Sequence, residues 1–227
     1  QIYMSIKKII AIAATKGGVG KSTFSAGLAL NLLKKYKVGI LDADIYGPNQ
    51  HIIFNTLNKK LEFSQDSKKI LPININGLLI NSMGYIVDQD IAATWRGPML
   101  SSAIRKLLTE TDWGDLDYLI IDMPPGTGDS YLTIASEIDH LETILITSKN
   151  KLSYYDLKKT ISMLKKLNTN ILGYVENNIS NYKGPLNDEE SLEFKKLGQI
   201  DFSDDLYNLK IENALHLFDD VTMKIIG

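Results

Sequence analysis

The stretch A-T-K-G-G-V-G-K-S-T, from Ala14 to Thr23, connects two segments with different hydrophobic patterns. Before it, Ile9 to Ala14 is a short, continuous apolar run that is typical of a buried strand. After it, Ser22 to Lys34 places apolar residues at helical spacing. A glycine-rich turn between a strand and a helix lets successive backbone N–H groups converge on one anion, next to the partial positive charge of the helix N-terminus. The sequence therefore predicts a phosphate-binding loop.

The side chains of this loop predict which phosphates it binds. Lys21 can reach β- and γ-phosphate oxygens, the Ser22 hydroxyl can bind Mg²⁺, and Thr23 is placed to contact the α-phosphate. We expect the ligand to be ATP with Mg²⁺. The residues expected to contact it are Gly17, Gly18, Val19, Gly20, Lys21, Ser22 and Thr23.

Further apolar runs predict a parallel sheet that is buried on both faces. The predicted strands are Val38 to Leu41, Tyr118 to Ile121, Thr143 to Ile146 and Ile171 to Val175. Helices are predicted from Pro98 to Leu108, from a cap at Asp129 or Ser130 to Ile138, and from Leu152 to Leu167. Asn76-Gly77 predicts a hairpin turn between Ile70 to Ile75 and Leu78 to Ile80. We expect an α/β fold, a doubly wound and mostly parallel sheet with helices on both faces, forming one domain over residues 4–227.

Carboxylates follow two of the predicted strands. Asp42 and Asp44 come directly after the second strand, and Asp122 ends the strand Leu119 to Ile121. The carboxyl ends of parallel strands form the edge where doubly wound sheets bind ligands, so these carboxylates should face the loop. Asp122 has the Walker-B arrangement and is expected to hold Mg²⁺ through water.

A stiff, glycine-containing segment follows Asp122. Pro124 and Pro125 restrict the backbone, and Gly126 or Gly128 can present an N–H group to the γ-phosphate, as a switch loop does.

The loop departs from the ordinary phosphate-loop pattern, because Thr15 replaces its first glycine and Lys16 adds a second lysine. In this it resembles the deviant loop of the MinD, ParA and nitrogenase-iron-protein group. The resemblance implies that Lys16 reaches across a dimer interface to the partner's phosphates and neutralises charge during phosphoryl transfer. It also implies that Asp44 orients the attacking water and that Asp42 supports the Mg²⁺ shell. The expected catalytic residues are then Lys16, Lys21 and Asp44.

Longer motifs narrow the resemblance to the Mrp (ApbC-type) ATPases, which are iron–sulfur cluster carriers. The motifs are W-G-D-L-D-Y-L-I-I-D-M-P-P-G-T-G-D (Trp113 to Asp129), D-A-D-I-Y-G-P (Asp42 to Pro48), W-R-G-P-M (Trp95 to Met99) and G-Y-V-E-N (Gly173 to Asn177). The resemblance runs from about Ile6 to Ser180. It implies a homodimer that binds MgATP between its subunits, hydrolyses it slowly and helps to deliver [4Fe-4S] clusters to client or scaffold proteins. It also implies that Asn177 contacts the adenine.

One feature of that family is missing. Cluster carriers of the family place a CxxC shortly after the V-E-N sequence, whereas this chain has Tyr182 to Leu186 there and contains no cysteine. Thiolate ligation of a cluster by this chain alone is therefore chemically unavailable. Three alternatives remain: a partner holds the cluster, the protein is a carrier relative with another task, or the sequence is an engineered cysteine-free form.

Composition argues against two other classes of partner. The 227 residues include 25 Lys and Arg against 27 Asp and Glu, a net charge of −2, so no nucleic-acid partner is indicated. No apolar run approaches the length of a membrane span, and we expect a cytoplasmic protein without stable membrane insertion.

Two alternatives to the Mrp-type function remain: a MinD- or ParA-like positioning ATPase acting on membrane or DNA, and a non-catalytic nucleotide-binding regulator. Against the first, the tail Asn208 to Ile226 carries acidic residues and is predicted to be a packing helix rather than a membrane anchor.

Overall fold

The computed structural model describes residues 5–14, 16–86, 97–126, 128–139, 141–167, 169–181 and 194–227. Several positions named above lie outside these ranges. They are Met4, Thr15, Trp95, Arg96, Thr127 and the segment Tyr182 to Leu186.

Eight strands of the described chain form one sheet, in the order β10-β9-β8-β1-β7-β2-β6-β5. All neighbours in this sheet pair in parallel except β5 and β6. The strands are β1 (Ile6–Ala13), β2 (Val38–Asp42), β5 (Ile73–Ile75), β6 (Leu78–Ser82), β7 (Leu116–Asp122), β8 (Glu142–Ser148), β9 (Asn170–Asn177) and β10 (Lys196–Ile200). This architecture confirms the predicted doubly wound, mostly parallel sheet.

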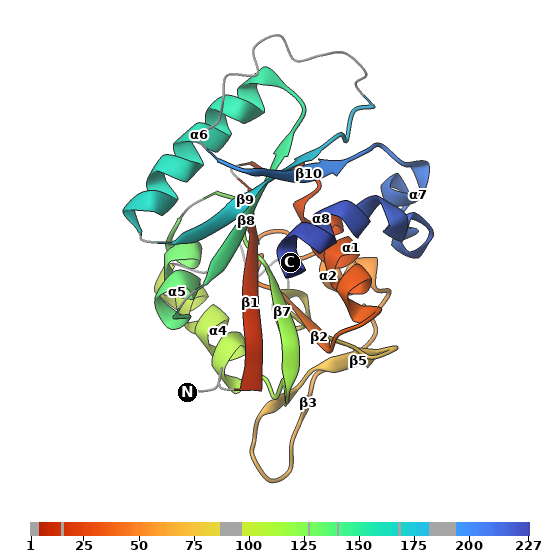
Figure 1. Cartoon of the computed structure of the whole chain (residues 1–227). Helices are drawn as coiled ribbons and strands as arrows, with labels where there is room; N and C mark the ends of the chain where they lie inside the picture. The colour runs from red at the N-terminus through yellow and green to blue at the C-terminus, as the bar shows by residue number, and fades with distance from the viewer. Residues whose placement is uncertain are drawn as a thin grey trace.

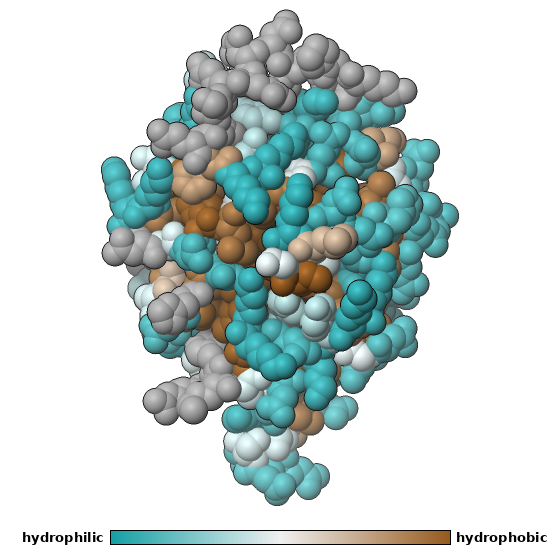
Figure 2. Space-filling view, viewed as in Figure 1, coloured by the Kyte–Doolittle hydropathy of each residue, from teal (hydrophilic) through white to brown (hydrophobic). Residues whose placement is uncertain are grey.

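Helices cover both faces of the sheet (Figure 1). One layer contains α1 (Lys21–Leu33), the 3-10 helix η3 (Ile211–Phe218) and α8 (Asp219–Ile226), and the other contains α4 (Gly97–Glu110), α5 (Asp129–Glu137) and α6 (Lys151–Lys166). Alternate residues of β1 pack into the two layers, because successive strand side chains point to opposite faces. The central strands are therefore mostly apolar, whereas hydrophilic residues cover most of the surface seen in Figure 2.

The hairpin at Asn76-Gly77 is confirmed, and the strand before it is shorter than predicted. Both turn residues have positive φ, 50° and 96°, as a type I′ turn requires. The predicted strand Ile70 to Ile75 is divided at Pro72, which has no N–H to donate to a strand ladder. The first part, β4 (Ile70–Leu71), pairs instead with β3 (Glu62–Phe63) in a separate two-stranded ribbon.

Two other boundaries differ from the predictions. Helix α5 begins at Asp129 with Gly128 in the N-cap position, so neither Asp129 nor Ser130 is its cap. Strand β10 was not predicted, because Lys-Leu-Gly-Gln-Ile has no long apolar run and its place is fixed by pairing with β9. The sequence of a short edge strand such as β10 shows only a weak local preference for strand structure.

The C-terminal stretch after Asn208 packs in the helix layer that contains α1. It is a packing segment, as predicted, but it forms short helices rather than one helix. After α7 (Asp204–Tyr207), η3 and α8 bury Phe218, Val221 and Ile225 against the core that contains α1. Among the residues that the structure describes, none of the helices combines the length and the apolar character that a membrane-spanning helix needs.

Candidate functional site

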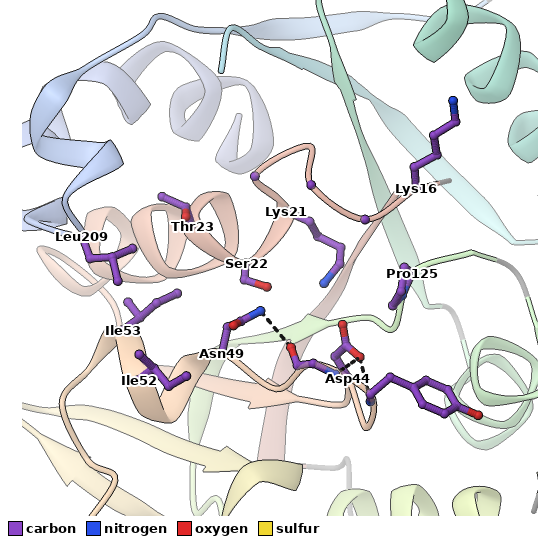
Figure 3. A pocket seen from close by; sticks show the side chains of 15 residues that line it. Lys16, Lys21, Ser22, Thr23, Asp44, Asn49, Ile52, Ile53, Pro125 and Leu209 are labelled. Atoms are coloured by element: carbon purple, nitrogen blue, oxygen red, sulfur yellow. Dashed lines mark hydrogen bonds between the residues drawn. The ribbon is translucent and has the colours of Figure 1, made fainter. Parts of the chain in front are cut away.

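The predicted carboxylates lie side by side at the carboxyl edge of the sheet. Strands β2 and β7 pair in a register that places Asp42 opposite Asp122, and β1 places Ile12 opposite Asp122. The loop that leaves β1 therefore begins beside both carboxylates. A cavity of about 520 Å³ opens at this point, lined by Lys16 to Gly18, Gly20 to Thr23 and part of the segment after Asp42 (Figure 3).

The phosphate loop presents backbone donors to this cavity. Gly18 and Gly20 both have φ of +80°, a left-handed conformation that glycine adopts without strain. Gly20 is the N-cap of α1 and supplies no side-chain cap, and the first turn of the helix contains no acidic residue. The N–H groups of the first turn are thus left for a ligand, beside the positive end of the helix dipole.

Asn177 supports the loop from the end of β9. Its Nδ2 donates a hydrogen bond to the Val19 carbonyl oxygen at 2.9 Å, and both side chains are buried. A Cβ atom on Gly20 would lie 2.2 Å from the same Nδ2, so the close approach of Asn177 is possible only with glycine there. This contact with the loop was not foreseen from the sequence, which indicated only an adenine contact for Asn177.

Lys21 is buried and paired with the Walker-B carboxylate. Its Nζ lies 2.6 Å from Asp122 Oδ1, and Ser25 Oγ donates to the same oxygen at 3.1 Å. Lys21 is 7% exposed and Asp122 is fully buried. Burial alone would lower the pKa of Lys21, but the charge and hydrogen bond of Asp122 outweigh it and raise this pKa. The lysine is therefore held as a cation at the edge of the cavity.

Asp42 anchors the segment that follows β2. Its two oxygens accept hydrogen bonds from the backbone N–H groups of Asp44, Asn49 and Gln50 and from the Ser82 hydroxyl, at 2.8–3.1 Å. The carboxyl group is fully buried, and burial together with the nearby Asp122 charge raises its pKa to about 7. In this structure Asp42 fixes the backbone that carries Asp44.

Asp44 faces the cavity from the side opposite Lys21 and Ser22 (Figure 3). Its Oδ1 accepts hydrogen bonds from the N–H groups of Tyr46 and Gly47, each at 3.1 Å, which fix the orientation of the carboxylate. Burial raises the pKa of Asp44, and the Lys21 charge acts in the opposite direction.

The Lys16 side chain starts at the rim of the cavity and points away from Lys21 and Asp44 (Figure 3), and it contacts Asp156 of α6. Its Nζ lies 2.5 Å from Asp156 Oδ2, in a salt bridge whose lysine side chain is 50% exposed and whose aspartate side chain is 20% exposed. The structure thus places Lys16 apart from Lys21 and Asp44, the other two residues predicted to be catalytic. Asp156 had no signal in the sequence, because only the packing of α6 brings it to the loop.

Gly126 lies next to the phosphate loop. Its N–H, one of the two predicted to contact a γ-phosphate, donates to the Ala14 carbonyl oxygen at 3.0 Å in this structure. Gly126 has φ of +81°, and a Cβ there would meet no atom within 4 Å. The segment is therefore attached to the strand that leads into the loop.

A second cavity of about 180 Å³ adjoins the first one through Gly20, Thr23 and Leu209. Its walls come from the end of β9 and from the segment after β10. The other lining residues are Asn177, Asn178, Ile179, Asp201, Phe202, Ser203, Leu206 and Tyr207. Except for Asn177, the sequence did not indicate these residues. Asn178 and Ile179 follow the predicted strand β9 but belong to no recognised motif, and the residues from Asp201 onward follow β10, which was not predicted.

The histidines do not add a metal site in the part of the chain that the structure describes. His51 is buried beside Tyr85, with 5.9 Å between ring centroids, and burial lowers its pKa. No group of three or more His, Cys, Asp or Glu side chains that could hold a metal occurs among the described residues. The residues available to Mg²⁺ are instead Ser22 and water-mediated carboxylates, which suits an ion that keeps several waters and shares its shell with phosphates.

The geometry fits a triphosphate with Mg²⁺. A Cβ on Gly17 or Gly18 would meet no atom within 4 Å, so the backbone borders open space, and the first turn of α1 has free donors next to a lysine and a serine. A glycine-rich loop from a central strand into a helix, with a lysine facing the carboxylate that ends a neighbouring strand, defines a P-loop NTPase.

The family of this NTPase follows from comparison with known proteins. A model of the ParA group, described as NUBPL iron-transfer P-loop NTPase, matches residues 5–224. The chain belongs to this family.

Curated relatives carry consistent descriptions. The iron-sulfur cluster carrier protein of Pseudomonas fragi is 45% identical over 174 residues, which cover 76% of this chain and 61% of the relative. That of Aquifex aeolicus is 37% identical over 221 residues, covering 96% and 60%, respectively. The mitochondrial iron-sulfur protein required for NADH dehydrogenase of Arabidopsis thaliana is 42% identical over 195 residues, covering 85% and 61%. The chain thus spans about three-fifths of the length of these relatives.

Solved structures agree on the fold. The Archaeoglobus fulgidus nucleotide-binding protein in complex with ADP has a TM-score of 0.72 and 29% identity, covering 94% of this chain and 89% of its own. The cell division ATPase MinD of Pyrococcus furiosus has a TM-score of 0.74 at 21% identity, covering 96% of this chain and 98% of its own. At this identity the likeness supports a shared fold only.

The buried Lys21–Asp122 pair leads to a prediction about stability. Lys21→Met removes the cation beside two buried carboxylates, so the nucleotide-free protein should lose about 3–5 kcal/mol of unfolding free energy at about pH 8. Asp42 has a folded-state pKa of about 7 against an ordinary 3.8, so its contribution to stability is full below pH 3.8 and is lost as the pH rises through 7. The deficit of the variant should therefore shrink as the pH falls below 7 and Asp42 takes up a proton. Denaturant unfolding across this pH range measures the effect.

A matched control is Lys7→Met, which removes an exposed pair with Asp117. It should leave the unfolding free energy almost unchanged. Equal losses in the two variants, or a deficit at Lys21 that does not vary with pH, would contradict the role assigned to the buried pair.

Proposed function

We propose that this chain binds MgATP in the cavity of the phosphate loop and hydrolyses it slowly. The observation that carries the proposal is the buried Lys21 held at 2.6 Å from Asp122, at the mouth of a glycine loop whose helix N-terminus has no internal cap. An uncapped helix start beside a buried cation is an anion site. Family membership and the ADP complex of the Archaeoglobus fulgidus protein support the assignment.

The residues around the cavity would have separate roles in phosphoryl transfer. Lys21 would exchange Asp122 for the β- and γ-phosphate oxygens, while the Ser22 hydroxyl and, through water, Asp122 would hold Mg²⁺. The bound ion would supply charge neutralisation of the phosphates. Asp44, oriented by the N–H groups of Tyr46 and Gly47, would position the attacking water. Turnover without further transition-state stabilisation is on the order of 10⁻⁴ to 10⁻² per second in enzymes of this type.

The nucleoside fits the second cavity. Thr23 belongs to both cavities and would contact the α-phosphate between them. Apolar side chains of Ile179, Phe202 and Leu206 offer surface for a base, and Asn177 offers an amide for its polar edge. Asn177 would keep its contact with Val19 through Nδ2 and use its remaining polar atom toward adenine.

We further propose that MgATP closes a homodimer through Lys16. Because Lys16 is bound to Asp156 in the isolated chain, reaching a partner's phosphates requires that salt bridge to open. Half-exposed salt bridges of this kind contribute little free energy in water, so a triphosphate can compete for the lysine.

We also propose that this nucleotide-binding chain acts in iron–sulfur cluster assembly or transfer. The relatives described as cluster carriers support that proposal, and the absence of cysteine from all 227 residues constrains it. Thiolate ligands for a cluster must come from a protein or segment outside this chain. The chain would then supply the nucleotide-dependent closure of the homodimer, while client or scaffold proteins hold the cluster.

The nucleotide assignment predicts the effect of Lys21→Met on binding. In titrations with ATP and Mg²⁺ at a pH where the variant is folded, its affinity should fall at least about tenfold, since an interaction with a charged phosphate is worth roughly 1.5–3 kcal/mol. An affinity equal to that of the parent would place the phosphates elsewhere.

The dimer assignment predicts a different result for Lys16→Gln. This variant should bind ATP as the parent does but hydrolyse it at least about 100-fold more slowly, because a hydrogen-bond donor to the transition state is lost. Lys34→Gln is the matched control, since Lys34 is similarly exposed and pairs with Asp219 at the far end of α1. Unchanged turnover in Lys16→Gln would refute the trans-acting role.

The cargo assignment predicts that anaerobic incubation with iron and sulfide, followed by desalting, leaves no thiolate-to-iron absorbance on this chain. The physical reason is the lack of any thiolate among its side chains. Parallel reconstitution of the double variant Lys183→Cys and Leu186→Cys, which restores the Cys-x-x-Cys spacing, serves as the positive control. A stable cluster on the unaltered chain would show that it binds a cluster by itself, through other ligands.

A further inference from the structure

Gln50 contacts the phosphate loop, the end of β2 and the end of β7. Neither the sequence motifs nor the comparisons give this residue a role. It is the first residue of α2 (Gln50–Ile53) and is fully buried. Its Nε2 donates to Asp122 Oδ2 at 2.8 Å and to the Ser22 carbonyl oxygen at 2.9 Å. Its backbone N–H donates to Asp42 Oδ2 at 2.9 Å.

The hydrogen bonds fix the orientation of the Gln50 amide. Both partners of its nitrogen are acceptors, so a flipped amide would place oxygen against oxygen at both contacts. The amide oxygen Oε1 is therefore a defined atom, buried and without a hydrogen-bond partner in the described structure. A buried acceptor without a donor is unfavourable and calls for a specific explanation.

The surroundings indicate what can supply that donor. The nitrogen of the same amide touches Ser22 and Asp122, the two residues proposed to hold Mg²⁺ directly and through water. Mg²⁺ usually keeps several of its waters when it binds with phosphates, and such waters donate hydrogen bonds to nearby oxygens. An unpaired acceptor next to these two residues suits a water of the metal shell.

The contact with Asp122 also has a role when the lysine moves. In this structure Lys21 and Ser25 contact Oδ1 of Asp122, whereas Gln50 contacts Oδ2. If Lys21 turns to the phosphates, the carboxylate loses its cationic partner but keeps the donor on its other oxygen. Gln50 thereby holds the plane of the carboxylate while its counter-charge changes.

We propose that Gln50 is a positioning residue for Mg²⁺, which orients Asp122 through Nε2 and accepts a hydrogen bond from metal-bound water through Oε1. The inference rests on the proposed MgATP function and adds a residue to it. Through its backbone contact with Asp42, Gln50 also connects the segment that carries Asp44 to the phosphate loop.

The test is a titration of the full chain with a fluorescent ADP analogue, first in EDTA and then over a range of Mg²⁺ concentrations. Gln50→Met keeps the size of the side chain and removes both polar atoms. It should bind the analogue in EDTA as the parent does but require about tenfold more Mg²⁺ for half of the metal-dependent gain in affinity, as expected for loss of a metal-orienting contact. An unchanged Mg²⁺ midpoint would overturn the inference.

Asn31→Leu separates this effect from general destabilisation. Asn31 on α1 is also a buried amide, with Nδ2 bonded to Thr222 Oγ1 at 2.9 Å and Oδ1 unpartnered, but it lies on the side of the helix that packs against α8. This variant should lower the melting temperature and leave the Mg²⁺ midpoint unchanged. A shift in its midpoint equal to that of Gln50→Met would assign the effect to lost stability and overturn the inference.

A measurement on the parent keeps the proposal testable if Gln50→Met does not fold. The side-chain amide signal of Gln50 in ¹⁵N NMR spectra of the ADP-bound chain should shift when Mg²⁺ is added, and no shift would overturn the inference. If the parent does not bind the ADP analogue at all, the proposed function fails with it. Normal nucleotide binding without the Gln50 effect defeats only the positioning role.

Discussion

The buried ion pair between Lys21 and Asp122 is the interaction on which the site depends. Two carboxylates, Asp42 and Asp122, lie opposite each other on neighbouring strands at a fully buried sheet edge, where uncompensated charge is costly. Lys21 compensates part of that charge, and backbone N–H groups compensate Asp42. In the proposed function, a triphosphate that attracts the lysine must bring a replacement cation, so the same electrostatic constraint would couple nucleotide binding to Mg²⁺ binding.

The two lysines of the loop are held in different ways, and this difference separates their proposed roles. Lys21 is almost completely buried and paired within the site, whereas Lys16 is half exposed and paired with Asp156 on α6. Opening a buried pair needs a strong ligand, while an exposed pair opens easily in water. In the proposed function, nucleotide binding by one chain and contact with a second chain would therefore occur as successive events.

Local sequence was sufficient to predict the features that depend on neighbouring residues. The glycine loop, the apolar strands and the carboxylates that end them were all found from spacing alone, because backbone chirality and strand direction bring those residues to one edge. Contacts made by tertiary packing were not found. Asp156 reaches Lys16 only because α6 crosses the sheet, and Gln50 reaches Asp122 across 72 positions of sequence. The second cavity was missed with β10, whose short sequence has no distinctive period.

The most direct test of the central claim is a crystal structure of this chain with Mg²⁺ and a non-hydrolysable ATP analogue. The account predicts that the phosphates lie on the backbone N–H groups of residues 17–23, that Lys21 Nζ has left Asp122 for the phosphate oxygens, and that Gln50 still contacts Asp122. An analogue bound elsewhere, or a Lys21–Asp122 pair unchanged beside bound phosphates, would contradict it.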